Sequence, residues 1–523
     1  MRRGGPRPAG RWRAACAVLA IAAIATPAAA VERPGQAAPA RSLAELDEAF
    51  AASARELARR AEADGHGELS QTITDWHLPA ADGRQLVVAI PAKLEKPVSV
   101  DTPDEQTIWD DFVAARRVRA GGLYEHAVFA ARAHDRVPTR DELAKPAADA
   151  PPLPQRSCEA IRLVFLALRD DPDLERARAA AGWVKHAGEW LWPEAVRRHE
   201  KGEAFDPAFG WMTKAKLDRY RKGERSDRGR WITAAEDAKR PREVKHGREF
   251  HSDHWDIVST ADLPDAAALA ARLEETRTVW RQVFGAFALE PKDLEKQLAG
   301  RGRTPPHAPH SAILCADRGQ YVAELEPLEP LIGKTNGIYW TPTKTIWFYA
   351  GGQAAAAGHG GGPDPVTVHH EATHQLFAEA RPGFEKTRQL AGDRSGFWAI
   401  EAAGVYLETI TPTAFGWTVG GRDAGRVPAA KERLDEGFFV PLAELCGLGR
   451  EAFQGDPRLP QLYSQIGGLA DFFMNGADGR YREAFLEYLV RVYSGTADPD
   501  TLFRLCKRSG PDLDAEYRRH LAR

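Results

Sequence analysis

Residues 364–380, DPVTVHHEATHQLFAEA, combine the boundaries of a helix with the spacing of a metal site. Asp364 can cap a helix and Pro365 suits its first turn, and an Arg-Pro-Gly triplet then ends it. Inside lies an HExxH motif in which His370 and His374 are four residues apart. Such positions share one face of a helix, about 6 Å apart along its axis. This pattern predicts two imidazoles that face one metal ion.

Two histidines in this arrangement can both bind zinc, at about 2.0–2.1 Å from each nitrogen. Glu371 is offset from the direction of the ligands, where it can take a proton from an attacking water as general base. The alternative is a histidine-rich surface helix without a metal. His369 projects about 100° away from His370 on a helix, so we expect it to be a bystander.

A catalytic zinc ion needs a third protein ligand and one open position. The candidate is Glu401 in residues 396–408, GFWAIEAAGVYLE, which the apolar composition predicts to be a largely buried helix. A buried acidic side chain is costly unless it is paired or bound to a metal. The alternatives are a glutamate on an exposed edge of this helix, or Glu408 as the ligand.

HEATHQLF followed by FWAIEAAGVYLE resembles the gluzincin metallopeptidases. More closely, it resembles peptidase-MA-like and uncharacterised exported bacterial families with HExxH followed by W-[LA]-x-E-G-x-A-x-Y. The likeness covers about residues 246–523. It implies that His370, His374 and Glu401 hold zinc and that Glu371 is the base. It also implies a small mixed sheet, an active-site helix and a helical C-terminal half.

Two positions depart from the pattern of these families. Ala402 stands where they usually have Gly, and Val405 stands where thermolysin-like relatives have an Asp that supports a ligating histidine. In these relatives a Tyr opens a helix downstream of the glutamate ligand and stabilises the oxyanion. Residues 462–473, LYSQIGGLADFF, resemble that helix, which makes Tyr463 the candidate.

A packed tyrosine is the alternative for this position, and Tyr406 or His310 are other candidates for the oxyanion donor.

Upstream of the motif, residues 337–350 predict a hairpin around Thr-Pro-Thr-Lys. In gluzincins a sheet edge before the zinc helix pairs with the substrate backbone, while the alternative is an ordinary core strand. Residues 351–363, GGQAAAAGHGGGP, follow the hairpin. We interpret them as a substrate lid or a plain flexible linker.

The first thirty residues have the pattern of a secretory signal peptide. Five arginines precede a short apolar stretch, and Ala-Ala-Ala at 28–30 provides a cleavage site before Val31. The alternative is an uncleaved anchor. Removing residues 1–30 changes the formal net charge from −3 to −8. We therefore expect an exported protein, periplasmic or extracellular, without a stable membrane span and without affinity for nucleic acid.

Export permits disulfides, but Cys158, Cys315, Cys446 and Cys506 are too far apart in sequence to define a framework. They allow three pairings, and buried free thiols are an equal alternative.

Residues 31–245 predict a mostly helical, Trp-containing region, beginning with a capped helix at 42–63. Two copies of a weak repeat start at Gly182-Trp183 and Gly210-Trp211, and we expect small helix or hairpin units with buried tryptophans. Residues 214–248 contain thirteen Lys or Arg and six Asp or Glu. They form either a contact for an anionic envelope polymer or a solvated face.

The sequence thus predicts an α+β protein of three segments: a signal peptide (1–30), the helical region (31–245) and a zinc metallopeptidase-like domain (246–523). The predicted function is zinc-dependent hydrolysis of peptide bonds in peptide or protein substrates. The alternatives are a non-catalytic exported scaffold on a degenerate peptidase fold, or a zinc enzyme that acts on a non-peptide amide.

Overall fold

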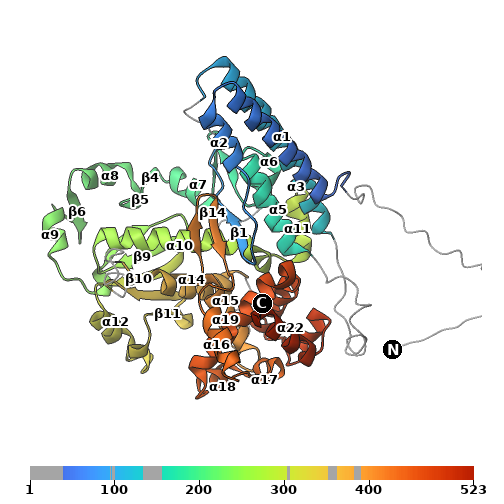
Figure 1. The fold of residues 1–523 in the computed structure, drawn as a ribbon. Coiled ribbons are helices and arrows are strands. Elements are labelled where there is room, and N and C mark those ends of the chain that lie inside the picture. The colour runs from blue at the N-terminus through green and yellow to red at the C-terminus, as the bar shows by residue number, and fades with distance from the viewer. Residues whose placement is uncertain are drawn as a thin grey trace, which may run out of the picture. The chain divides into compact units, whose positions relative to one another are not determined.

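The computed structural model describes residues 39–94, 96, 100–132, 156–302, 307–351, 362–381 and 390–522. The predicted signal peptide and most of the glycine-rich loop at 351–363 lie outside these ranges. Pro39–Arg523 forms one compact unit. Helices surround several small sheets in this unit, so the predicted α+β class is confirmed (Figure 1).

Helices that pack against one another begin this unit. They are α1 (Leu43–Ala63), α2 (Gly67–Asp75), α3 (Pro103–Ala130), α5 (Ser157–Asp170) and α6 (Glu175–Ala180), with strand β1 (Gln85–Val88) between α2 and α3. The predicted cap of α1 is present, because Ser42 and Glu45 exchange side-chain to backbone hydrogen bonds. Helix α5 ends at Asp170. Pro172 lacks an N–H and keeps the residue before it out of the helical conformation.

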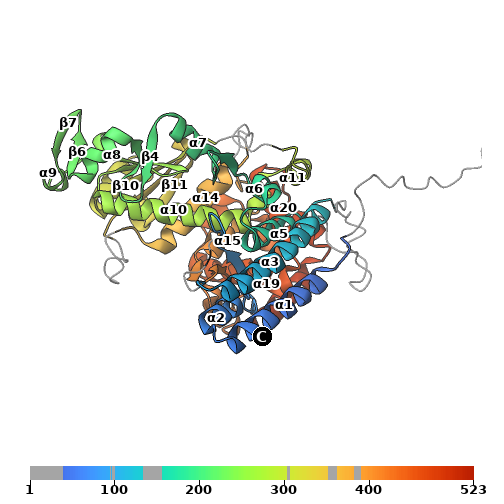
Figure 2. The ribbon, with the colours of Figure 1, turned by 90° about the horizontal axis from the view of Figure 1, so that it is seen from above.

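Three hairpin–helix units follow, where the sequence suggested two. They are β2 (Val184–His186), β3 (Glu189–Leu191) and α7 (Pro193–Glu200); β4 (Glu203–Asp206), β5 (Gly210–Thr213) and α8 (Lys214–Arg221); and β6 (Glu224–Asp227), β7 (Arg230–Thr233) and α9 (Ala234–Ala238). Both views show them in a row with α9 at the far end (Figures 1 and 2).

The equivalent tryptophan of each unit is the second residue of its second strand: Trp190, Trp211 and Trp231. The structural counterpart of Trp211 in the first unit is therefore Trp190 and not Trp183. Of the three, Trp211 is buried, whereas Trp231 is 37% exposed. The sequence predicted Trp183 and Trp211 to be buried. This is confirmed for Trp211, whereas Trp183 is half-buried.

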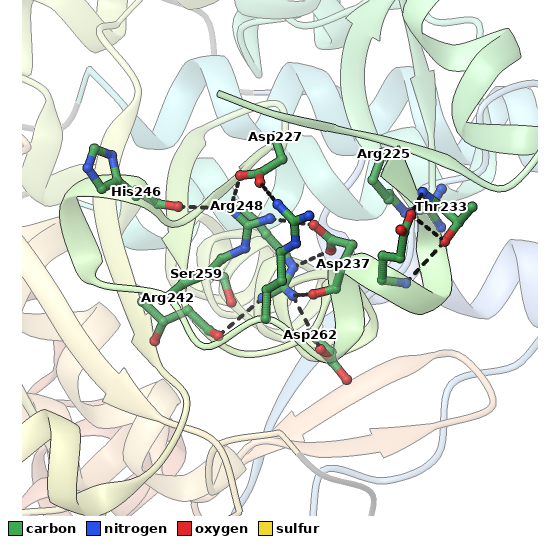
Figure 3. A network of polar contacts seen from close by, with 12 residues as sticks. Arg225, Asp227, Thr233, Asp237, Arg242, His246, Arg248, Ser259 and Asp262 are labelled. Carbon is green, nitrogen blue, oxygen red and sulfur yellow. Dashed lines mark hydrogen bonds and ion pairs between the residues drawn. The ribbon is translucent and has the colours of Figure 1, made fainter. Parts of the chain in front are cut away.

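A network of ion pairs joins the third unit to the next strand (Figure 3). The buried Asp237 accepts hydrogen bonds from Arg248 Nε at 2.6 Å and from Arg242. Arg242 also reaches Asp227 at 3.0 Å, and Arg240 pairs with the same carboxylate. Some of the basic residues of 214–248 therefore form ion pairs within the protein that stabilise the packing of the third unit.

A five-stranded sheet carries the HExxH helix, in the strand order β11-β12-β10-β9-β8. Its strands are β8 (Arg248–His251), β9 (Trp255–Ser259), β10 (His310–Cys315), β11 (Gly337–Trp340) and β12 (Thr345–Tyr349). The three central strands are parallel, and the edge strands β8 and β11 are antiparallel to their neighbours. The predicted hairpin is β11–β12, and β11 is indeed the edge strand.

Alternate residues of the central strands face two different cores, as the period of a strand requires. Ile346 and Phe348 of β12 belong to the main core with α10 (Leu263–Val283) and α14 (Pro365–Glu379). Tyr349 instead belongs to a smaller cluster with Tyr321 of α12 (Arg318–Leu325). The HExxH helix therefore packs on one face of the sheet, beside α10.

The C-terminal half is helical, as predicted. It contains α15 (Phe397–Leu407), α16 (Val427–Asp435), α17 (Leu442–Gly447), α18 (Arg450–Gln454), α19 (Leu459–Gly479), α20 (Arg482–Tyr493), α21 (Thr501–Cys506) and α22 (Gly510–Ala522). Helix α11 (Pro291–Leu298) lies earlier in the chain, between α10 and β10. Strands β13 (Thr411–Thr413) and β14 (Gly416–Val419) pair with each other, and β14 pairs with the N-terminal β1.

The compact unit thus contains residues from both sides of the boundary predicted near residue 245. That residues 246–523 form a domain of their own stays a prediction. Cys158, Cys315, Cys446 and Cys506 are all buried and free. Among the described residues, no helix is both long and apolar enough to span a membrane.

Candidate metal centre

The structure brings His370, His374 and Glu401 together. The two Nε2 atoms are 3.0 Å apart. The Glu401 carboxylate lies 3.5 Å from His370 Nε2 and 3.8 Å from His374 Nε2. Ligand atoms around a tetrahedral zinc ion with bonds of about 2.0–2.1 Å are about 3.3 Å apart. The shorter Glu401 distance is to Oε2 and the longer to Oε1. Two nitrogens and a carboxylate this close together could hold a zinc ion and leave one position open.

The local sequence explains why the two helices approach so closely. The HExxH helix α14 starts at Asp364, which accepts a hydrogen bond from Thr367 N, and has Pro365 in its first turn, as predicted. It packs against α15, where Glu401 is 6% exposed. At Gly404 of α15, a Cβ atom would lie 2.9 Å from the His370 ring. A glycine here leaves the room that the imidazole needs.

Glu408, the rival third ligand, has a different position. Its Oε1 lies 2.8 Å from His370 Nδ1, on the ring nitrogen that does not face the cluster. Arg426 donates to both oxygens of Glu408, each at 3.1 Å. Glu408 thus holds the His370 ring in place through the nitrogen that does not face the cluster.

Glu371 contacts the edge of the sheet. Tyr339 N of the edge strand β11 donates to its Oε2 at 2.9 Å. Burial raises the Glu371 pKa to about 7, although the nearby His370 acts in the opposite direction. A carboxylate with a pKa near neutrality is well suited to take a proton and to return it.

The carboxylates and imidazoles of this site shift one another's pKa values. Burial raises the Glu401 pKa, but the nearby His374 and His370 outweigh this and lower it to about 2. Burial lowers the His374 pKa to about 4. Burial also disfavours the charged form of His370, but hydrogen bonds to Glu401 and Glu408 raise its pKa to about 10. A divalent cation would neutralise these buried carboxylates.

Tyr463 also reaches the site, from α19. Its hydroxyl donates to Glu401 Oε2 at 2.8 Å. Arg426 lies over its ring, with Cζ 5.2 Å from the ring centroid. The hydroxyl therefore lies beside the candidate metal ligands and orients the glutamate that the sequence predicts as the third ligand.

The other candidates lie outside the cluster. Tyr406 is buried and donates to Asn475 Oδ1 at 3.0 Å. His310 contacts Glu379 through Nδ1 at 2.8 Å. His369 turns toward α10, where its Nδ1 lies 2.8 Å from Thr276 Oγ1, as expected of a bystander.

Sequence reasoning missed the parts played by Tyr339 and Arg426. Tyr339 contributes its backbone N–H, which leaves no trace in residue type. Arg426 lies in a turn before α16, and no motif marks it. Comparison with family models, with curated proteins and with solved structures found no match for this chain.

Proposed function

We propose that the protein is an exported zinc-dependent metallopeptidase. The observation that carries this proposal is the convergence of His370, His374 and Glu401 beside Glu371, at the edge of a sheet. A nucleophile-activating carboxylate next to a three-ligand site is the arrangement that metal-assisted hydrolysis requires.

In this proposal His370, His374 and Glu401 hold zinc. The bound ion would supply a Lewis acid for the scissile carbonyl. Glu371 accepts the proton of the attacking water and delivers it to the leaving amine. The Tyr339 N–H keeps the Glu371 carboxylate oriented between these two steps. The Tyr463 hydroxyl, which donates to Glu401 Oε2 at 2.8 Å, is the proposed donor to the oxyanion.

The position of strand β11 at the edge of the sheet favours a peptide as the substrate. It is the outermost strand of the sheet on the side of Tyr339 and Glu371. An extended peptide that added to this edge would be held by main-chain hydrogen bonds, with little demand on its sequence. Its backbone would then lie directly beside the proposed base.

The feature that favours the non-catalytic alternative is Val405, which stands where an Asp would support a ligating histidine. Glu408 provides a carboxylate on His370 Nδ1 instead. With this support present, no observation on the described residues favours a scaffold over an enzyme.

Glu371→Gln tests the proposal together with metal analysis. We expect the purified wild-type chain to hold about one zinc ion, the stoichiometry of one catalytic site. The variant should keep this zinc and lose about 10²–10⁴-fold in peptide hydrolysis, the usual contribution of a general base. Glu432→Gln, an exposed change on α16, is the matched control. Full activity of the Glu371→Gln variant, or a wild-type chain that binds no zinc, would contradict the proposal.

A further inference from the structure

A cavity of about 580 Å³ lies at the C-terminal end of the HExxH helix, outside the metal centre. This is within the range of about 300–1,000 Å³ typical of small-molecule sites. Apolar side chains of α5, α10, α11 and α14 form much of its wall: Phe165, Trp280, Leu294 and Leu376.

Two arginines of α10, one turn apart, give this cavity positive charge. Arg277 and Arg281 both lie over the ring of Trp192, with Cζ at 4.9 and 4.4 Å from its centroid. Neither has an ion pair within 4.0 Å in the part of the chain that the structure describes. Arg281 donates to Ala181 O, while Arg277 has no hydrogen bond to a described residue.

Burial disfavours the charge of both arginines. It lowers the Arg277 pKa, although the carboxylates of Glu274, Glu194 and Asp253 act in the opposite direction. Burial and the charge of Arg277 bring the Arg281 pKa to about 9, against the effect of Glu194. Arranging two cations in this way costs free energy, and an anion between them would recover it.

The acidic residues of the cavity already have partners. Glu194 accepts a hydrogen bond from His307 N at 2.7 Å. Glu379 is engaged by His310 Nδ1 at 2.8 Å and by the Tyr339 hydroxyl at 3.2 Å. Asp293, the third acidic residue of the wall, pairs with Lys296 at 3.0 Å. These acidic residues are thus engaged elsewhere, and none of them forms an ion pair with Arg277 or Arg281 within the described residues.

Two further nitrogens in the wall are unsatisfied. His254 Nε2 and Trp280 Nε1 are buried and have no hydrogen-bond partner among the described residues. Both side chains are more than nine-tenths buried, and both line the cavity. Glu194 Oε2 lies 3.9 Å from His254 Nε2, which is too far for a hydrogen bond. Buried polar groups without partners are rare in folded proteins, and a ligand is one explanation.

We infer that this cavity binds a small amphipathic carboxylate. Its carboxylate would lie between Arg277 and Arg281, since guanidinium groups match carboxylate geometry. Its apolar body would fill the space along Phe165, Trp280 and Leu376. This site is separate from the metal centre, so the inference does not rest on the proposed function.

Calorimetric titration of the full chain with phenylbutyrate tests the inference, with phenylbutanol and phenylbutylamine as uncharged and cationic matches. We expect saturable binding of one phenylbutyrate, and binding of the other two that is at least about tenfold weaker. Arg277→Gln should weaken phenylbutyrate by at least about tenfold, the effect of losing one charge-assisted hydrogen bond, and leave phenylbutanol unchanged. Arg277→Lys should restore part of the loss.

Two controls keep this experiment decisive. Arg519→Gln, at the far end of α22, should bind phenylbutyrate as the wild type does. Ala288→Trp, which fills the cavity and keeps both arginines, should abolish binding. The inference is overturned if phenylbutyrate does not saturate, if it binds no better than phenylbutanol, or if a chelator removes the binding and so assigns it to the metal centre.

Discussion

At the scale of single residues, two glutamates have different tasks around His370: Glu401 within α15 and Glu408 at the C-cap of that helix. Glu401 faces Nε2 together with His374, and Glu408 faces Nδ1. A ligand must reach the nitrogen that binds the metal, whereas a supporting carboxylate must reach the other one. The tautomer of His370 follows from this, because a carboxylate on Nδ1 holds the proton there and leaves the Nε2 lone pair for the metal.

Glu408→Ala should therefore weaken zinc binding by about 10–100-fold, the usual effect of losing such a support. Glu408→Gln keeps a hydrogen-bond acceptor and should lose less. Competition with a chromophoric chelator measures both affinities, and Glu432→Ala is the control for an acidic residue removed elsewhere. An unchanged affinity of the Glu408→Ala variant would show that the His370 ring needs no support from α15.

At the scale of elements, the hairpin–helix units show how a charge run can be structural. The sequence of residues 214–248 suggests a basic surface, yet Arg242 and Arg248 are largely buried on the carboxylates of Asp227 and Asp237. The third unit is short and ends the row, so it has little apolar area to bury. Ion pairs hold this unit against β8. That the exposed basic residues of 214–248 contact an anionic polymer stays a proposal.

Asp237→Ala should destabilise the packing of the third hairpin–helix unit against β8. The substitution leaves buried arginines without their carboxylate partner. Breaking a buried ion pair in this way costs about 3–5 kcal/mol of stability. We expect faster proteolytic cleavage within 224–240 and a lower free energy of unfolding. Asp218→Ala, at an exposed position of α8, is the matched control. Equal cleavage of the Asp237→Ala variant and the wild type would mean that the network adds nothing to the stability of the unit.

At the scale of the whole molecule, residues distant in sequence hold the compact unit together. Strand β1 pairs with β14 from the C-terminal half. Glu483 of α20 accepts hydrogen bonds from Cys158 N and Glu159 N, at 3.1 and 3.2 Å. It thereby caps α5, whose own N-cap residue, Arg156, provides no side-chain bond.

The burial of the Glu483 carboxyl makes stability depend on pH, against the opposite effect of its hydrogen bonds from Cys158 N and Glu159 N. Burial raises the Glu483 pKa from 4.5 to about 7. The folded state therefore holds this proton more tightly than the unfolded state does. The resulting stabilisation is complete below about pH 4.5 and is lost as the pH rises through 7. A shift of this size corresponds to about 3 kcal/mol.

Glu483→Gln cannot ionise and should lose this part of the pH dependence. Urea unfolding at pH 5 and pH 8.5 measures most of it: the free energy of unfolding of the wild type should fall by about 2.5 kcal/mol more than that of the variant. Glu487→Gln, on the same helix, is the control. Parallel pH profiles for the Glu483→Gln variant and the wild type would contradict this assignment.

Local patterns were predictable from the sequence because their partners lie within a few residues. The cap at Ser42, the start of the HExxH helix at Asp364 and the β11–β12 hairpin depend on such short separations. The third hairpin–helix unit was also present in the sequence, as the spacing of Trp190, Trp211 and Trp231. It was missed because the repeat was aligned on Gly-Trp pairs.

What the sequence by itself determined is the set of reactive residue types and the helices that carry them. Only the tertiary structure decided which glutamate faces His370 Nε2, where Tyr463 donates, and that Tyr339 orients Glu371. The same holds for the arginines beside Trp192. These contacts join residues far apart in the chain, and a distance between such residues follows from packing rather than from any local periodicity.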